Sequence, residues 1–97
     1  MNIFSEFKNH IDVIVDELSK AGELPGGLDT AAVTVEPPRD ASHGDLASNV
    51  ALVLSGQAGA KPRDIAGLIA RRLADRDAVE SVEVAGPGFI NLRLADD

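Results

Sequence analysis

The spacing of hydrophobic residues along the chain predicts a helix over residues 2–21. Within this range, apolar side chains recur every three or four positions and polar ones fill the positions between them, as on an amphipathic helix. A Pro-Gly-Gly sequence at residues 25–27 prevents the helix from continuing. The predicted apolar stripe consists of Phe4, Phe7, Ile11, Ile14, Val15 and Leu18.

Shorter stretches with a period of two predict β-strands. In residues 31–38, Val33 and Val35 share one face of a strand. Pro37 and Pro38 have no N–H to donate to a sheet, so the strand ends there or runs along an edge. The strands predicted elsewhere cover a short stretch near residues 44–47 and the ranges 79–84 and 89–94.

Two loops are expected to depend on glycine. Between the last two strands, Pro87 presets its own φ angle and Gly88 accepts a positive one, which together with Gly86 suits a tight, type II-like turn. Earlier in the chain, Gly44 is expected to adopt a backbone angle that other residues avoid, and Asp45 to cap the segment that follows it.

The middle of the chain predicts further helical structure. Residues 48–54 have helical character, and residues 55–61 are expected to form a flexible link. Pro62 suits the first position of another helix, because an N–H at that position has no helical partner. The apolar stripe of this helix is Ile65, Leu68, Ile69 and Leu73, and its arginines, Arg63, Arg71, Arg72 and Arg76, are expected to be solvated.

The order of these elements predicts an α+β fold. A two-layer arrangement, with an antiparallel sheet of about four strands and helices packed on one of its faces, buries all of the apolar stripes. With 97 residues, of which 44% are hydrophobic, the chain has enough apolar surface for one such core. Residues 1–97 are therefore expected to form a single domain.

Composition and motifs exclude several classes of protein. The chain has no cysteine, no phosphate-binding glycine loop and no zinc-binding pair of histidines, so we expect neither a metal site nor a cofactor. Its apolar runs are far shorter than the roughly 20 residues of a membrane span, and no secretory signal is recognisable, so we expect a cytoplasmic protein. His43 and Asp45 are a possible acid–base pair, but no nucleophile lies nearby in the sequence, and a turn is the favoured interpretation.

The charge of the chain is unevenly distributed. A net charge of −7 argues against a general binder of DNA or RNA, because such proteins carry a basic surplus. The first thirty residues are acidic, whereas most of the basic residues come later, so any phosphate contact has to use a local basic surface in the second part of the chain.

The last predicted strand carries unusual chemistry on one face. If Ile90, Leu92 and Leu94 face the helices, then the alternating residues Phe89, Asn91 and Arg93 share the open face of the sheet. An unpaired base can stack on the ring and pair its edge with the carboxamide, while the guanidinium reaches a phosphate or stacks.

The spacing of these three residues is also compatible with a purely structural role, and by itself it favours that role over RNA binding. In that interpretation, Phe89 covers the end of the core and Asn91 forms hydrogen bonds with polar groups of a neighbouring loop. In the same interpretation, Arg93 pairs with Glu83 across the hairpin. The corresponding functional hypothesis is a protein interaction domain whose open sheet face packs on another protein or domain without RNA contact.

Three segments together resemble the N-terminal additional domain of bacterial-type arginyl-tRNA synthetases, and the resemblance extends over essentially the whole chain. Its most specific parts are the His43-Gly44-Asp45 sequence with Ser48-Asn49 and the sequence from Gly86 to Asn91. The three segments are VEPPRDASHGDLASNVAL, KPRDIAGLIARRL and VESVEVAGPGFINLRL, in this order.

The resemblance implies both a fold and a function. It implies an α-β-β-α-β-β domain that docks on the D-loop of tRNA(Arg) and, as part of an arginine–tRNA ligase, helps to select the tRNA. Phe89 and Asn91 match the family positions that contact the base at tRNA position 20. Asn49 is expected to make a further polar contact and Gly44 to serve the backbone.

The resemblance also implies what the chain lacks. The ATP-site signatures of the family's catalytic domain are not present in this sequence, so we expect an inactive recognition module cut from its enzyme. ATP and magnesium would bind only in the missing catalytic domain. The expected partners are the tRNA and that catalytic body, with no DNA and no membrane, and the module is expected to be a monomer.

Overall fold

Two amphipathic helices and one mainly apolar helix form the helical layer of the protein. The computed structural model describes residues 2–95 and contains the helices α1 (Ile3–Lys20), α2 (Val50–Ala58) and α3 (Pro62–Ala74). The Asn2 side chain caps α1 by accepting a hydrogen bond of 2.7 Å from the Phe4 N–H, and Pro62 begins α3 as predicted. None of the helices between residues 2 and 95 is long and apolar enough to cross a membrane.

Four strands form the second layer. They are β1 (Val35–Glu36), β2 (Leu46–Ser48), β3 (Val79–Ala85) and β4 (Phe89–Leu94), with a short 3-10 helix, η1 (Ala41–His43), between β1 and β2. The sheet is antiparallel throughout, in the order β1-β2-β4-β3, so that β4 lies between β2 and β3. The predicted α+β fold is confirmed.

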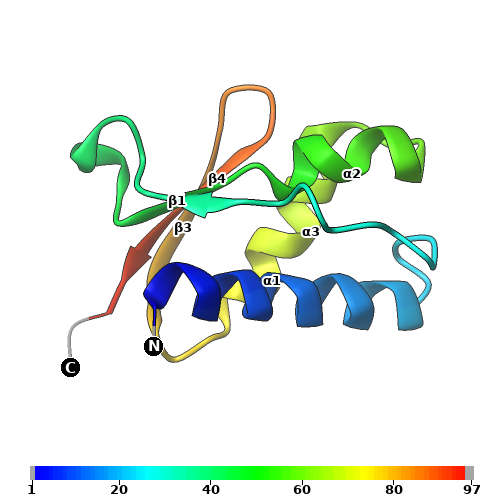
Figure 1. Cartoon of the computed structure of the whole chain (residues 1–97), viewed down its shortest axis with the longest axis horizontal. Helices are drawn as coiled ribbons and strands as arrows, with labels where there is room; N and C mark the ends of the chain where they lie inside the picture. The colour runs from blue at the N-terminus through cyan, green and yellow to red at the C-terminus, as the bar shows by residue number, and fades with distance from the viewer. Residues whose placement is uncertain (1, 96–97) are drawn as a thin grey trace.

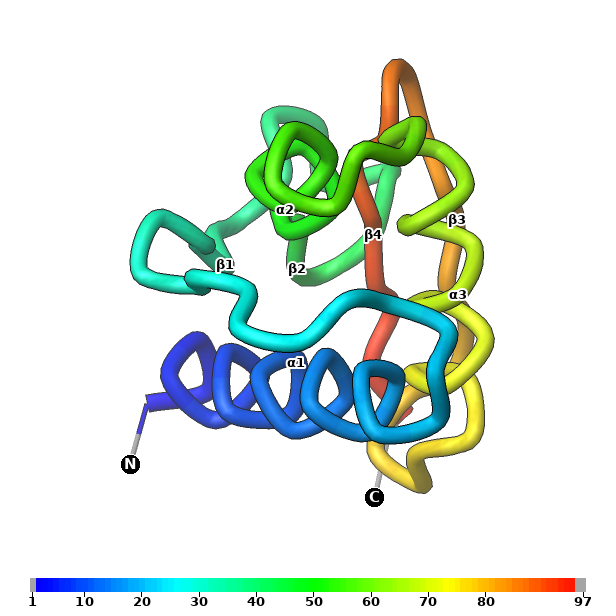
Figure 2. Tube along the Cα trace, turned by 90° about the vertical axis from the view of Figure 1, so that its right-hand side faces the viewer, coloured from blue at the N-terminus to red at the C-terminus, as the bar shows by residue number. Residues whose placement is uncertain are grey.

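The helices lie on one side of the sheet (Figure 1). Figure 2 looks at this side and shows α2 and α3 in front of the strands, with α1 running along the lower edge. The core lies between the two layers, where Phe7 and Ile11 of α1 meet Ile69 of α3 and Ile90 and Leu92 of β4, all with no exposed surface. The other face of the sheet is left uncovered by helices.

Two strands differ from their predicted bounds by more than one residue. The strand expected over residues 31–38 is reduced to Val35–Glu36, because the N–H groups of Val33 and Thr34 bond to the Thr30 carbonyl and to the Asn49 side chain instead of to a neighbouring strand. The short strand expected near residues 44–47 lies at Leu46–Ser48.

The link expected at residues 55–61 is also shorter than predicted. Helix α2 continues to Ala58 and ends at Gly59, which has a φ of 65° and therefore forms a left-handed cap. Residues 50–54 are apolar throughout, so their pattern does not show where the helix ends.

The β3–β4 turn corrects the prediction of a type II-like turn. Gly86 has a φ of 56° and is the first central residue of a turn in which the Gly88 N–H donates to the Ala85 carbonyl at 3.2 Å. A positive φ at the first central position is the pattern of a type II′ turn, whose twist matches that of a β-hairpin. Pro87 is therefore the second central residue, not the first.

Two other expectations about polar residues are also wrong. Arg72 and Arg76 are partly buried in ion pairs rather than simply solvated. Asp45 does not cap the segment after it. Instead, its Oδ2 accepts a hydrogen bond of 2.8 Å from the Leu94 N–H, and its own N–H donates to the Leu92 carbonyl at 2.7 Å.

Candidate nucleic-acid interface

The alternation of side chains along β4 separates core residues from surface residues. Ile90 and Leu92 are fully buried under the helices, whereas Phe89 is 43% exposed and Arg93 is exposed on the opposite face. Asn91 lies between these two on the open face and is 7% exposed. The predicted division of this strand between core and open face is confirmed.

A row of residues in register crosses the open face at Asn91. Asn91 pairs with Ala47 of β2 on one side and with Glu83 of β3 on the other, and Ala47 pairs with Glu36 of β1. Residues that face each other across strands point to the same side of a sheet. Because Ala47 has only a methyl group, the side of Asn91 toward β1 is left open.

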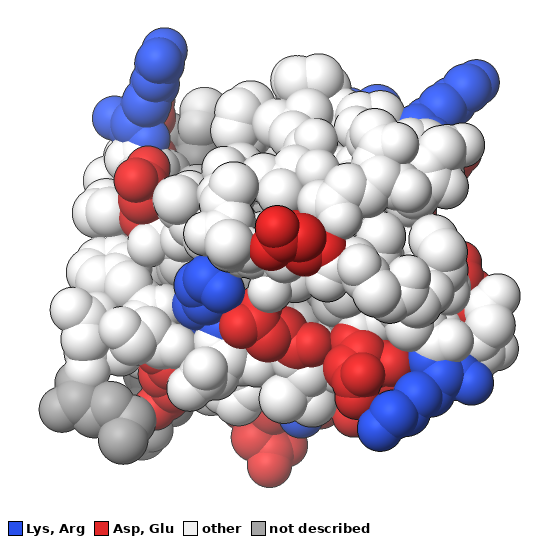
Figure 3. Space-filling view, turned by 45° about the vertical axis from the view of Figure 1, so that its right-hand side comes forward, with Lys and Arg blue, Asp and Glu red and all other residues white. Residues whose placement is uncertain are grey.

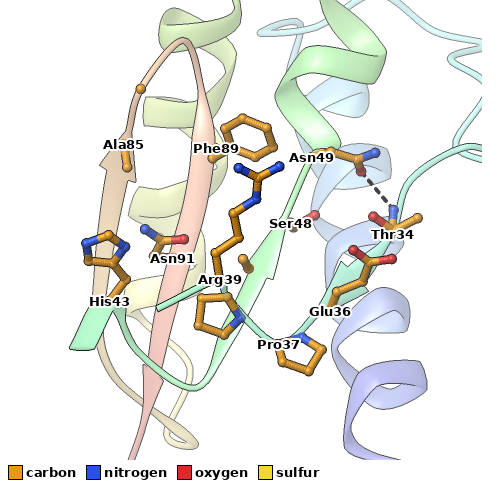
Figure 4. A pocket seen from close by; sticks show the side chains of 13 residues that line it. Thr34, Glu36, Pro37, Arg39, His43, Ser48, Asn49, Ala85, Phe89 and Asn91 are labelled. Carbon is orange, nitrogen blue, oxygen red and sulfur yellow. Dashed lines mark hydrogen bonds between the residues drawn. The ribbon is translucent and has the colours of Figure 1, made fainter. Parts of the chain in front are cut away.

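The open face contains a hollow of about 530 Å³ at this place. Phe89 and Asn91 from β4, Glu36 from β1, Arg39 and His43 from the β1–β2 connection and Asn49 after β2 are among its lining residues. Figure 4 shows these side chains around the space, which we call the β4 hollow. Its volume lies within the range of about 300–1,000 Å³ that is usual for sites of small ligands.

Helix α3 fixes the hairpin tip beside Phe89. A Cβ atom added to Gly88 would lie 2.8 Å from the Pro62 Cβ, and Gly88 has a φ of 149°, so only glycine allows the turn to pack this closely against the helix. The Arg63 guanidinium donates a hydrogen bond to the Gly86 carbonyl. These contacts hold the start of β4, and hence the Phe89 backbone, in place.

The η1 wall of the hollow is held to β4 at its Gly44 end. Gly44 has a φ of 129°, and a Cβ atom there would lie 2.5 Å from the Leu92 carbonyl oxygen. The backbone therefore lies in close contact with β4, and the positive φ confirms the unusual backbone angle predicted for Gly44. The Asp45 carboxylate completes this attachment through its bond to the Leu94 N–H.

Side-chain hydrogen bonds stabilise η1 itself. The Asp40 carboxylate caps it by accepting a bond of 2.9 Å from the Ser42 N–H. This backbone hydrogen bond, together with one from the Ser42 side chain, lowers the pKa of Asp40 below its ordinary value of 3.8. Arg93, which lies opposite Ser81 rather than Glu83, donates a bond of 3.1 Å to the Ser42 carbonyl.

Asn49 has a structural role on the other side of the hollow. Its Oδ1 accepts a bond of 2.8 Å from the Thr34 N–H, which Figure 4 marks, and its Nδ2 donates to the Ala32 carbonyl at 3.4 Å. The amide therefore joins the segment before β1 to the start of α2. A contact between Asn49 and RNA remains a prediction.

The structure brings together three of the four residues that the sequence singled out for RNA binding. Phe89, Asn91 and Asn49 line the β4 hollow, whereas Arg93 lies outside its lining and is bonded to η1. Arg39 and Glu36 also line the hollow, although no motif in the sequence singled them out. The signal that could have found them is the pair of prolines after β1, which marks the edge of the open face.

The β4 hollow has the chemistry that an unpaired nucleobase requires. A half-exposed ring can stack on a base, and an amide offers a donor and an acceptor to its edge. Figure 4 draws no hydrogen bond from the Asn91 amide to the other lining residues. In the range 2–95, no three His, Asp or Glu side chains are grouped in a way that could hold a metal ion.

Comparison with known proteins identifies the family of the chain. The family model of the arginyl tRNA synthetase N terminal domain matches residues 6–94, a range that includes the whole lining of the β4 hollow. The chain belongs to this family. The open face of its sheet is therefore part of an arginyl-tRNA synthetase N-terminal domain.

Individual relatives agree with this assignment. The chain is 58% identical over 94 residues to an arginine–tRNA ligase of Paracoccus denitrificans (strain Pd 1222) and 54% identical over 97 residues to one of Jannaschia sp. (strain CCS1). These matches cover 97% and 100% of the chain, but only 16% and 17% of the two relatives. The chain thus corresponds to a small part of each ligase.

Proposed function

We propose that this chain contacts the D-loop of tRNA(Arg) and thereby helps an arginine–tRNA ligase in the cytoplasm to select its tRNA. The observation that carries the proposal is the β4 hollow, in which the exposed Phe89 ring and the Asn91 amide lie side by side on an open sheet face of a domain from this family. Arginine, ATP and magnesium are assigned to the catalytic body of such a ligase.

Phe89 and Asn91 have separate tasks in this proposal. Phe89 provides a stacking surface for one base that has left the helical stack of the D-loop, and Asn91 pairs with the edge of the same base. Each contact of this kind is worth about 1–3 kcal/mol. Because Asn91 is 7% exposed in the free protein, its amide meets a base only when the base enters the hollow.

The charge of the chain supports a division of labour with the catalytic body. At a net charge of −7, the domain repels the RNA backbone over most of its surface, so most phosphate contacts must come from the remainder of the ligase. On its own the chain is expected to bind tRNA no more tightly than about 10⁻⁴–10⁻⁶ M, as is usual for non-specific binding.

Aminoacylation kinetics of a ligase that carries this domain test the proposal. Asn91→Ala should raise the KM for tRNA(Arg) about 5- to 150-fold, which corresponds to about 1–3 kcal/mol, and leave kcat almost unchanged. Asn9→Ala, which removes an exposed amide from α1, is the matched control and should change neither constant. An unchanged KM in Asn91→Ala would contradict the proposal and favour a surface that packs on protein.

A further inference from the structure

Arg39 lacks the acidic partners that four basic residues of the helical layer have. Arg72 and Arg76 lie near Glu17 of α1, and Lys8 and Lys20 pair with acids one turn away. Arg39 is exposed and takes part in none of the ion pairs formed within residues 2–95. Its charge is therefore available to a ligand.

The backbone directs Arg39 into the β4 hollow. Pro37 and Pro38 restrict the chain before it, and the next residue, Asp40, is fixed by its bond to the Ser42 N–H. In Figure 4, the Arg39 side chain rises from the Pro37 end of the hollow, and its guanidinium is directed toward the Phe89 ring. Arg39 is the only Lys or Arg in the described lining of the hollow.

The charged residues around the hollow favour different positions for a base and for its phosphate. Glu36 lines the hollow near Thr34, so an anion is repelled from that wall. A base carries no charge and can lie between the walls, but its nucleotide also brings one phosphate to the rim. The guanidinium of Arg39 is the group that attracts this phosphate, and its planar fork can donate two hydrogen bonds to it.

We infer that Arg39 binds the phosphate of the nucleotide whose base enters the β4 hollow. Arg39 is then a third tRNA-binding residue, which neutralises charge while Phe89 stacks on the base and Asn91 reads its edge. This inference rests on the proposed function, because it needs a nucleotide in the hollow. It gives the acidic domain one local site of attraction for RNA.

The salt dependence of tRNA binding distinguishes a phosphate contact from a base contact. Each phosphate contact to single-stranded RNA contributes about 0.7 to the slope of log K against log salt concentration. For the 97-residue chain with tRNA(Arg), Arg39→Gln should weaken binding about five- to tenfold at 50 mM KCl and reduce the slope by about 0.7. Arg39→Lys should restore most of the slope, because it keeps the charge.

Two further variants complete the experiment. Arg71→Gln, which removes an exposed arginine of α3 outside the hollow, should leave both the affinity and the slope unchanged. Asn91→Ala should weaken binding without changing the slope. Circular dichroism of each variant confirms that its fold is retained.

The outcomes separate this inference from the proposed function. If Asn91→Ala weakens binding but Arg39→Gln leaves both affinity and slope unchanged, or lowers affinity at an unchanged slope, Arg39 does not bind phosphate and the proposed function stands. If Asn91→Ala binds tRNA as tightly as the unaltered chain, the proposed function fails and this inference fails with it.

Discussion

The helical layer and the open sheet face satisfy their polar groups in opposite ways. Between α1 and α3, Arg72 lies 3.6 Å from Glu17 and 3.3 Å from Glu23, and Arg76 lies 3.9 Å from Glu17. Figure 3 shows acidic and basic side chains intermingled over the lower part of one face, where α1 runs. On the sheet face, by contrast, the Arg39 guanidinium forms none of the ion pairs found within residues 2–95, and it lies beside the uncharged Phe89 ring and Asn91 amide.

This difference shows that the net charge of the chain does not describe how charged groups are arranged in the two regions. Helix α1 carries four acidic residues, and three of them, Asp12, Asp16 and Glu17, are paired with lysines and arginines of the helices. Around the β4 hollow, the chain instead uses positive φ angles at Gly44 and Gly88 to bring backbone segments close together. Polar contacts of the helical layer stabilise the fold, whereas the proposed function uses Phe89 and Asn91 on the sheet face to bind RNA.

The largest expected effect comes from a comparison of two residues of β4, Leu92 and Phe89, which point to opposite faces of the sheet. Leu92→Ala should lower the free energy of unfolding by about 2–5 kcal/mol, because Leu92 is fully buried and its loss leaves a cavity. Phe89→Ala removes a half-exposed ring and should cost only about 1 kcal/mol. Urea unfolding of both variants checks this, and equal losses would mean that the ring belongs to the core.

The next largest effect on the free energy of unfolding is expected at Gly44, which holds the segment after η1 against β4. Gly44→Ala should lower the free energy of unfolding by about 2–3 kcal/mol, because the added Cβ meets the Leu92 carbonyl and the φ of 129° is strained for alanine. Gly67→Ala in α3 is the matched control. It meets no atom within 4 Å and should stabilise the protein by up to about 1 kcal/mol. If both variants shifted the urea midpoint alike, the close approach at Gly44 would be refuted.

A smaller effect is expected from the paired charges of the helical layer. Arg72→Gln should lower the free energy of unfolding by at most about 1 kcal/mol, because its two ion pairs are partly exposed and screened by water. It should leave the Kd for tRNA within about twofold of the unaltered value, since Arg72 already has acidic partners. Thermal unfolding and a tRNA titration check the two parts, and a large loss of tRNA affinity would move the binding surface to α3.

The smallest effect is the pH dependence of η1. Because hydrogen bonds from Ser42 lower the pKa of Asp40 in the folded protein, its carboxylate stabilises η1 fully above its ordinary pKa of 3.8 and loses this effect as the pH falls through the lower folded value. An NMR titration should therefore give Asp40 a lower midpoint in the folded chain than in urea. Coincident midpoints would mean that the carboxylate does not cap η1.

The sequence predicted the regular parts of the fold and one face of the site. Periodicity placed α1 and β4 almost to the residue, because burial of one stripe or one strand face determines these elements. Periodicity failed where local hydrogen bonds replace those between strands, as at Thr34, whose N–H donates to the Asn49 side chain. The partners of Asp45 and Arg93 could not be predicted either, since both lie on segments that only the antiparallel pairing of β2 with β4 brings together.

The central claim is that the open face of β4 receives RNA while the helical layer does not. An NMR titration of the isotopically labelled 97-residue chain with a D-arm hairpin of tRNA(Arg) tests it directly. We predict that the Phe89 ring and Asn91 side-chain amide signals shift, and that those of Val13, which is 50% exposed on α1, stay in place. Shifts at Val13 with unmoved Phe89 and Asn91 signals would contradict the account.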